Sequence, residues 1–279
     1  MIGTDIKMPV TPYTNVAESK KEQVEKMFNA IAFRYDLLNQ LLSFGIHKRW
    51  RKKAIRLLNS KIPAWPVRRT PFGAARLNAQ SLPSRSEELL SEQPGLICLD
   101  VATGTADFAI DACTLKPKKI IGIDISADML SIGREKIKLK NLSHLIELVQ
   151  ADSEDLPFPD NHFDAATVGF GVRNFENLDK GLLEICRVLK KGGVFAVLEF
   201  SIPEKFPMKQ LYNFYFKNIC PLIGRIISKN PIAYTYLFKS ASAFPYGENF
   251  KSILFKCGFS EINVVPQTFG IVTIYIAQK

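Results

Sequence analysis

The chain is poor in the residues that build disulfide frameworks and metal sites. Its 279 residues include five cysteines, an odd number, and no two of them form a C-x-x-C pair. Three cysteines lie inside apolar runs, which predicts reduced, mostly buried thiols of a cytoplasmic protein. The three histidines, His47, His144 and His162, do not pair with the cysteines at the spacing that zinc ligands need. We therefore expect no metal site.

Long hydrophobic runs are also missing. No uninterrupted apolar stretch reaches the length of a bilayer span, and the first residues lack the basic and apolar parts of a signal segment. We expect a protein that is cytoplasmic, or peripheral on the inner face of the membrane. With 47% hydrophobic residues the chain can bury a substantial core, and its net charge of +10 favours contact with something anionic.

The run LICLDVATGTAD at positions 96–107 carries the clearest functional pattern. Its apolar start predicts a short buried strand that Asp100 closes, and small residues around Gly104 turn the chain into a helix beginning near Asp107. A second apolar strand follows at 120–123 and ends at Asp124. In a doubly wound sheet, an acidic residue at that place accepts hydrogen bonds from the ribose hydroxyls of an adenosine ligand.

Three explanations of this turn compete. A nicotinamide or flavin dinucleotide needs G-x-G-x-x-G, whose glycines make room for a pyrophosphate, but the matching positions here are Ala102, Gly104 and Asp107. The carboxylate of Asp107 would repel a pyrophosphate but not the sulfonium of S-adenosylmethionine, and Asp100 adds charge of the same sign. We therefore favour S-adenosylmethionine as the cofactor over a dinucleotide. A turn that binds nothing would not explain why two strands both end in an acid.

Alternating periodicity predicts an α/β fold with a doubly wound, mostly parallel seven-stranded sheet. Further strands are expected at 145–150, 163–168 and 194–199, helices at 127–140 and 178–189, and a turn at 190–193. Two β-branched segments at 262–265 and 271–277 predict a C-terminal antiparallel hairpin.

We divide the chain into three parts. Helical periodicity from Glu18 and again from His47 to Leu58 predicts an N-terminal helical cap over residues 1–60. Residues 61–95, with scattered prolines, are predicted to be an irregular insertion with one short helix near 86–91. Residues 96–279 form the core, with lid helices at about 204–245.

Several motifs resemble a known family over most of the chain outside residues 1–15 and 61–95. The strand followed by D-x-x-x-G, the second-strand Asp, DSEDLPF at 152–158 and KKGG at 190–193 are similar to class I S-adenosylmethionine-dependent methyltransferases. YDLLNQLLS at 35–43, followed by His47 and Trp50, and RVLKKGG at 187–193, followed by LEFS at 198–201, resemble the UbiE/MenG family of quinone C-methyltransferases. The segments 170–174 and 270–275 also fit this family.

The resemblance implies methylation of a ring carbon of a polyprenyl quinol. It favours conversion of demethylmenaquinol to menaquinol in menaquinone biosynthesis, and the methoxy-polyprenyl-benzoquinol of the ubiquinone pathway is the alternative substrate. The position before Phe170, often serine in relatives, is Gly169 here, so a hydroxyl contact to the cofactor would be lost.

Six residues are expected to bind the cofactor. Asp124 would accept both ribose hydroxyls, and Thr105 would contact the methionine portion. By resemblance, Asp152 and Ser153 would lie beside the adenine. Asp100 and Gly104 belong to the turn itself. Ordinary structural explanations stay open: a solvated strand end for Asp124, turn chemistry for Thr105, and a helix N-cap for Asp152 and Ser153.

Methyl transfer to carbon needs an electron-rich ring, which deprotonation of a quinol hydroxyl supplies. The candidate catalytic residues are His47, Asp36, Tyr35 and the pair Arg173 and Asn174. Arg173 would stabilise the developing phenolate, or else form a structural ion pair. His47 has a suitable ordinary pKa but is equally explained as a structural histidine.

Two basic regions, at 47–56 and 205–239, flank the expected substrate entrance. The second is rich in aromatic residues, and such helices either contact an anionic membrane or form a lid with a solvated basic rim. A similar surface suits single-stranded nucleic acid, but the N-P-P-Y-type turn common in nucleic-acid methyltransferases is GFGV at 169–172 here. We expect a polyprenyl quinol substrate, transient membrane contact and no nucleic acid. A methyltransferase of other molecules and a non-catalytic cofactor-binding scaffold of a quinone-synthesis complex remain as alternatives, and the oligomeric state stays open.

Overall fold

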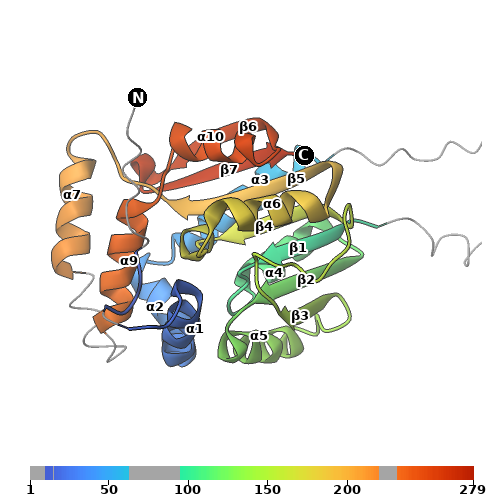
Figure 1. Cartoon of the computed structure of the whole chain (residues 1–279), viewed down its shortest axis with the longest axis horizontal. Helices are drawn as coiled ribbons and strands as arrows, with labels where there is room; N and C mark the ends of the chain where they lie inside the picture. The colour runs from blue at the N-terminus through green and yellow to red at the C-terminus, as the bar shows by residue number, and fades with distance from the viewer. Residues whose placement is uncertain (1–9, 15, 63–94, 220–230) are drawn as a thin grey trace, which may run out of the picture.

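The computed structural model describes residues 10–14, 16–62, 95–219 and 231–279. A seven-stranded sheet lies at the centre, with strand order β3-β2-β1-β4-β5-β7-β6 (Figure 1). Neighbouring strands from β3 to β5 are parallel, whereas β7 runs antiparallel to both β5 and β6. The predicted doubly wound sheet with a C-terminal antiparallel hairpin is confirmed.

The elements follow the predicted alternation of helices and strands. The strands are β1 (Ile97–Val101), β2 (Lys119–Asp124), β3 (Ile146–Gln150), β4 (Phe163–Gly169), β5 (Leu189–Phe200), β6 (Ser260–Gln267) and β7 (Val272–Gln278). The α-helices are α1 (Lys20–Ile31), α2 (Tyr35–Leu42), α3 (His47–Asn59), α4 (Asp107–Ala112), α5 (Ala127–Leu139), α6 (Leu178–Val188), α7 (Met208–Phe214), α9 (Pro231–Ala243) and α10 (Glu248–Lys256). Shorter turns of helix are η1 (Ala32–Arg34), η3 (Cys113–Leu115), η4 (Val172–Asn174), the π-helix η5 (Tyr215–Ile219) and η6 (Thr268–Gly270).

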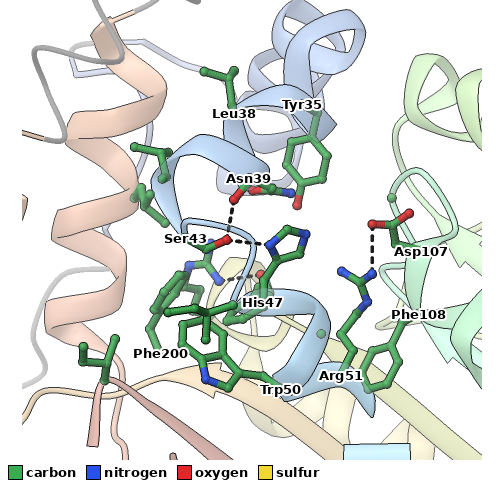
Figure 2. Close-up of a pocket in the computed structure, with 18 of the residues that line it drawn as sticks. Tyr35, Leu38, Asn39, Ser43, His47, Trp50, Arg51, Asp107, Phe108 and Phe200 are labelled. Atoms are coloured by element: carbon green, nitrogen blue, oxygen red, sulfur yellow. Dashed lines mark hydrogen bonds and ion pairs between the residues drawn. The ribbon is translucent and has the colours of Figure 1, made fainter. Parts of the chain in front are cut away.

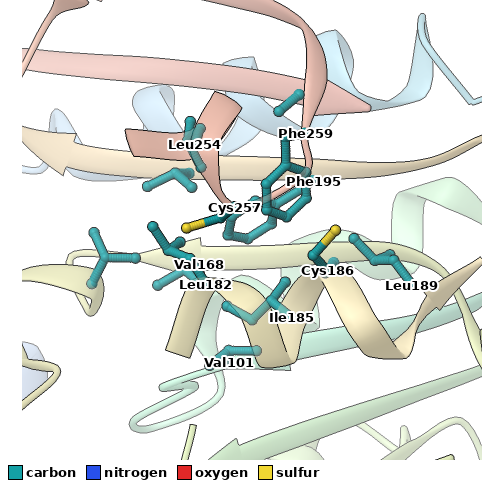
Figure 3. Close-up of a cluster of buried hydrophobic side chains, with 14 of the residues drawn as sticks. Val101, Val168, Leu182, Ile185, Cys186, Leu189, Phe195, Leu254, Cys257 and Phe259 are labelled. Carbon is teal, nitrogen blue, oxygen red and sulfur yellow. The ribbon is translucent and has the colours of Figure 1, made fainter. Parts of the chain in front are cut away.

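Helices cover both faces of the sheet. One face packs against α6 and α10 (Figure 3), and the other against α3, α4 and α5. Because successive strand residues point to opposite faces, β5 sends Phe195 to the first cluster and Ala196 to the second. Cys186 and Cys257 are free thiols in the first cluster, in keeping with reduced cysteines.

A third layer lies over one end of the sheet. Helices α1, α2, α7 and α9 contribute Met27, Leu38, Tyr212 and Tyr236 to one buried cluster, which also includes Met129 of α5. Helix α1 begins with a capping box, in which the Ser19 hydroxyl accepts from the Glu22 amide and the Glu22 carboxylate accepts from the Ser19 amide. These helices belong to the expected cap and lid, and they enclose the space beyond the carboxyl ends of the strands.

Two local predictions differ from the structure. The turn at 190–193 is wrong, because β5 runs from Leu189 to Phe200 without a break. Gly192 adopts a φ of +77°, and the register against β4 shifts between Phe163 and Ala165, so the extra residues are absorbed within the strand. Helix α10 had not been predicted.

Part of the predicted organisation is outside the described residues. This holds for nearly all of the insertion at 61–95, including the short helix near 86–91, and for residues 220–230 of the lid. Within the described ranges, no helix combines the length and apolar composition that crossing a membrane requires.

Removal of the Phe250 side chain tests the packing of α10. Phe250 is fully buried, with ring centroids 4.8 Å from Phe244 and 4.8 Å from Tyr275. We expect Phe250→Ala to lower the free energy of unfolding by about 3–5 kcal/mol, because it leaves a cavity. Phe255 lies on the same helix with 70% of its surface exposed, and Phe255→Ala should change stability by less than about 0.5 kcal/mol. Urea denaturation followed by circular dichroism measures both, and equal losses would contradict this account of the core.

Candidate active site

Two adjoining cavities lie beyond the carboxyl ends of the central strands. The larger, of about 360 Å³, is bounded by α1, α2, α3, α7, α9 and the ends of β4 and β5. The smaller, of about 60 Å³, lies between α1 and the ends of β1, β2 and β3. Both are lined by Phe28, Tyr35, Gly104, Gly169 and Phe170. A ligand in the small cavity can therefore meet a ligand in the large one at these shared residues.

A buried carboxylate organises the turn after β1. Asp100, only 1% exposed, accepts hydrogen bonds from Thr103 Oγ1 in the turn (2.6 Å) and from Thr167 Oγ1 in β4 (2.7 Å). Burial raises the pKa of Asp100 to about 6, while these two bonds favour its ionised form. Gly104 has a φ of +55°, a conformation that glycine adopts at low cost.

Asp124 stands at the end of β2 beside the small cavity. Its Oδ2 accepts from the Gly104 amide (2.8 Å) and its Oδ1 from the Ser126 amide (2.9 Å). Burial raises the pKa of this carboxyl. Each carboxylate oxygen carries more than one lone pair, so acceptor capacity remains toward the cavity. The Asp124 carboxylate thus has two acceptor oxygens and no donor, which suits the two hydroxyls of a vicinal diol.

The opposite wall of the small cavity is held by α1. Lys21 Nζ lies 2.8 Å from Asp152 Oδ2, and both residues line this cavity together with Ser153. Lys20 Nζ donates to the backbone carbonyls of Arg173 (3.1 Å) and Phe175 (2.6 Å). Burial lowers the Lys20 pKa to about 8. Helix α1 is thus fastened across the small cavity.

His47 faces the large cavity from the start of α3 (Figure 2). The Ser43 hydroxyl donates to the Asn39 carbonyl (2.6 Å), so it accepts from Nδ1–H of His47 (2.5 Å). This bonding pattern assigns the hydrogen to Nδ1 and leaves Nε2 as the acceptor nitrogen of the neutral ring. Burial, helped by Arg51, lowers the His47 pKa to about 4. The ring is therefore neutral near pH 7.

Aromatic rings form another wall of the large cavity. The ring centroids of Trp50 and Phe170 lie 6.3 Å apart, and those of Phe170 and Phe200 lie 4.6 Å apart. Phe170 has a φ of +58°, a strained conformation for a bulky residue and one that clusters at functional sites. Such a wall suits a flat, apolar ring.

A buried ion pair lies beside this wall. Arg173 Nη1 is 2.7 Å from Glu199 Oε1, and the guanidinium carbon lies 5.4 Å from the Phe200 ring centre. Burial raises the Glu199 pKa, whereas Arg173 counteracts that rise. Arg173 Nε and Glu199 Oε2 are both buried without a hydrogen-bond partner. Unpaired buried atoms of this kind commonly bind a ligand or ordered water.

Comparison with known proteins places the chain in a family. The model of the ubiE/COQ5 methyltransferase family matches residues 16–68 and 82–279. The chain belongs to the ubiE/COQ5 methyltransferase family. The expectations of a methyltransferase and of S-adenosylmethionine as its cofactor are thereby confirmed.

Individual relatives of this ubiE/COQ5 methyltransferase agree along nearly its whole length. A demethylmenaquinone methyltransferase of Bacteroides fragilis is 44% identical, covering 97% of each chain. A ubiquinone/menaquinone biosynthesis C-methyltransferase UbiE of a Geobacter species (strain M21) is 39% identical, covering 93% of this chain and 97% of the relative. The solved structure of an S-adenosylmethionine-dependent methyltransferase of Thermotoga maritima has a TM-score of 0.57 at 19% identity, covering 91% of this chain and 99% of the other. That likeness concerns the fold alone.

The predicted cofactor residues fall around the two cavities of this ubiE/COQ5 methyltransferase. Asp124, Asp152 and Ser153 line the small cavity, Asp100 and Thr105 line the large one, and Gly104 lines both. A side chain at Gly169 would clash with Phe108, since a Cβ there would lie 2.8 Å from the Phe108 ring. In this chain the Phe108 ring therefore occupies space that a serine side chain at this position would need.

The predicted catalytic residues do not all lie at one cavity. His47, Tyr35 and Arg173 line the large cavity, while Asn174 lines the small one and accepts from the Tyr236 hydroxyl (3.1 Å). Asp36 is not among the residues lining either cavity. It lies 2.9 Å from Lys136 Nζ and accepts from Thr105 Oγ1 at 2.6 Å, so its carboxylate is engaged outside the cavities.

Asp107 is not the free negative charge that its place in the sequence indicates. It pairs with Lys136 and with Arg51 Nη2 (3.2 Å). Burial opposes its ionisation, yet Arg51 and Lys136 together lower its pKa. Its charge is thus largely compensated within the protein, and the preference for a cationic ligand rests on Asp100 and Asp124 instead.

Sequence reasoning missed three contributors. Ser43 and Asn39 fix the tautomer of His47, and Glu199 faces Arg173. The first two stood inside the family-like segment at 35–43, and Glu199 in the segment at 198–201. Their place in these family-like segments was the available signal.

Substitution of Asp124 tests the adenosine side of the site. Asp124→Asn replaces one acceptor oxygen by a donor, and we expect about 10-fold to 100-fold weaker S-adenosylmethionine binding, as for the loss of one or two charge-assisted hydrogen bonds. Asp128→Asn, at an exposed position in the first turn of α5, is the matched control. Titration calorimetry measures both affinities, and an unchanged affinity in Asp124→Asn would remove this residue from the cofactor site.

Proposed function

We propose that the chain transfers the methyl group of S-adenosylmethionine to a ring carbon of a polyprenyl quinol, with demethylmenaquinol as substrate and menaquinol as product. One observation carries this proposal: an apolar cavity with an aromatic wall meets the small cavity at Phe170. Relatives named for menaquinone synthesis match nearly all of the chain, which favours a naphthoquinol over the benzoquinol of the ubiquinone pathway.

The residues of the small cavity fit the adenosine part of the cofactor. Asp124 offers two acceptor oxygens to a diol, and Asp152 and Ser153 offer polar atoms at the far end. The buried carboxylate of Asp100 gives the turn a negative charge that suits a cation. When bound, S-adenosylmethionine supplies a methyl group on a positively charged sulfur, which an electron-rich carbon can displace.

We propose that His47 takes the proton of the quinol hydroxyl. Nε2 is the acceptor nitrogen of the ring, and His47 lines the cavity that would hold the quinol. A water-poor cavity strengthens the interaction of the resulting phenolate with nearby positive charge. Arg173, with its unpaired Nε, is the nearby cation, and Glu199 holds its guanidinium in place. We assign Asn174 to positioning, through its bond with Tyr236, and leave Asp36 without a catalytic role.

The polyprenyl tail of the substrate bears on where the enzyme works. A quinol with such a tail resides in a bilayer, so we propose that the enzyme works in peripheral contact with the membrane that holds its substrate. The net charge of +10 favours an anionic membrane face.

The assay for this function uses purified protein, labelled S-adenosylmethionine and a short-tailed demethylmenaquinol. We expect label in the quinol fraction and a product heavier by one methyl group in place of hydrogen, measured by mass spectrometry. The corresponding benzoquinol, run in parallel, should react more slowly. Tight binding of S-adenosylmethionine with no transfer to either quinol would instead favour a non-catalytic scaffold.

The role of His47 is tested by three variants. His47→Gln should lower kcat by about 100-fold or more, since a positioned general base contributes on this scale. Ser43→Ala should lower kcat less, because it frees the tautomer but keeps the ring. His144→Gln, at an exposed histidine, is the control and should retain full activity. Cofactor affinity, measured separately, should be unchanged in all three, and a fully active His47→Gln would exclude the proposed proton transfer.

A further inference from the structure

An apolar stripe runs along the outer face of the N-terminal helices. Phe33 in η1 and Leu37 and Leu41 in α2 follow one another at spacings of four residues, and Phe44 stands in the turn just after α2. Their exposed fractions are 92%, 54%, 40% and 76%. Leu38, next to Leu37 along α2, belongs to the buried core. Single exposed apolar residues are ordinary, but four large ones within twelve consecutive residues mark an interaction surface.

A second exposed apolar group adjoins this stripe. On α7, Leu211 and Phe214 are 55% and 59% exposed. The two elements touch, because the Tyr215 hydroxyl donates to the Leu42 carbonyl (2.8 Å) and the Tyr215 ring lies 6.5 Å from that of Phe44. Helices α2, α7 and α9 lie on the same side of the molecule (Figure 1). The two groups together form one surface, here called the apolar rim.

The apolar rim surrounds the mouth of the large cavity. Phe44 and Leu211 line that cavity and are also exposed, so they stand where it opens. Leu37, Leu41 and Phe214 are not among its lining residues, so they extend the rim outward. An apolar path therefore leads from the surface to the aromatic wall.

The charge around the rim is mainly positive. The sequence has no Asp or Glu between positions 37 and 62 or between 205 and 247. Exposed cations in the described parts of these segments include Lys48 and Arg49 beside the stripe and Lys205, Lys209 and Lys217 around α7. Asp36 lies within the stripe but is paired with Lys136, and Glu204 adjoins Lys205. Exposed apolar side chains flanked by an excess of cations match the headgroup and acyl layers of an anionic bilayer.

We propose that the apolar rim docks on an anionic membrane surface, with the stripe and α7 at the level of the acyl boundary and the lysines among the headgroups. This proposal rests on the proposed function, because it places the cavity mouth where a quinol tail leaves the bilayer. The tail passes between Phe44 and Leu211 while the ring reaches His47. A protein partner would need carboxylates opposite the lysines, and a second copy of the chain would bring like charges together.

Vesicle sedimentation tests the docking surface directly. Full-length protein should bind vesicles of phosphatidylcholine with phosphatidylglycerol. Its binding to vesicles of phosphatidylcholine alone should be at least 10-fold weaker. Leu37→Glu with Leu41→Glu should weaken binding to the anionic vesicles by at least 10-fold. Leu183→Glu with Phe255→Glu, at positions 52% and 70% exposed on α6 and α10, is the matched control and should bind like the unmodified protein.

Activity measurements separate docking from catalysis. The Leu37→Glu, Leu41→Glu variant should methylate a short-tailed, water-soluble quinol at the normal rate but a long-tailed quinol in vesicles at least 10-fold more slowly. If the unmodified protein methylates no quinol yet binds anionic vesicles through the rim, the proposed function fails and the docking surface stands. Vesicle binding that is absent, or unaffected by the rim variant, would overturn the docking proposal. Conversion of a dimer to a monomer by that variant, seen in gel filtration, would overturn it in favour of a second copy.

Discussion

The site depends on one buried carboxylate. Asp100 is enclosed at the end of β1, and it accepts from Thr103 in the following turn and from Thr167 in the neighbouring strand. These bonds hold the turn in the shape that points the Gly104 amide at Asp124. If either threonine bond were lost, a buried charge would lack compensation, which is expensive in a low-dielectric interior. The turn, the carboxylate of Asp124 and the meeting point of the two cavities therefore share one support.

The large cavity combines an apolar wall with few polar groups, each of which is already oriented. His47 has its tautomer fixed by Ser43, and Arg173 is held by Glu199. Orientation in advance matters because a reaction whose chemistry is carried by its two ligands gains mainly from alignment. The strained backbone of Phe170, which lines both cavities, lies where that alignment has to be set.

Local patterns predicted the sheet and the strand-end acids well, because each acid directly follows an apolar run whose period reveals the strand. Partnerships between distant residues were not predictable in this way. Asp107 and Asp36 both pair with Lys136, which lies on α5, and nothing near them in sequence announces that contact. The link between Ser43 and His47 depends on a tight connection in which Gly45 has a φ of +75°. The turn at 190–193 was mispredicted because a Lys-Lys-Gly-Gly sequence is compatible with a turn and also with a bulged strand.

The fastening of α1 has a consequence for the timing of turnover. Two lysine ammonium groups at the first turn of the helix hold it in place, one bonded to backbone carbonyls and one to Asp152 at the small cavity. A ligand that left this cavity past α1 would need these contacts to break, which would tie that route to the fraying of a helix end. Such fraying costs little free energy compared with other openings of a folded chain. Ionic strength and pH would affect it through the ammonium groups of Lys20 and Lys21. The rate at which a ligand leaves past α1 would then depend on a helix end and not on the sheet.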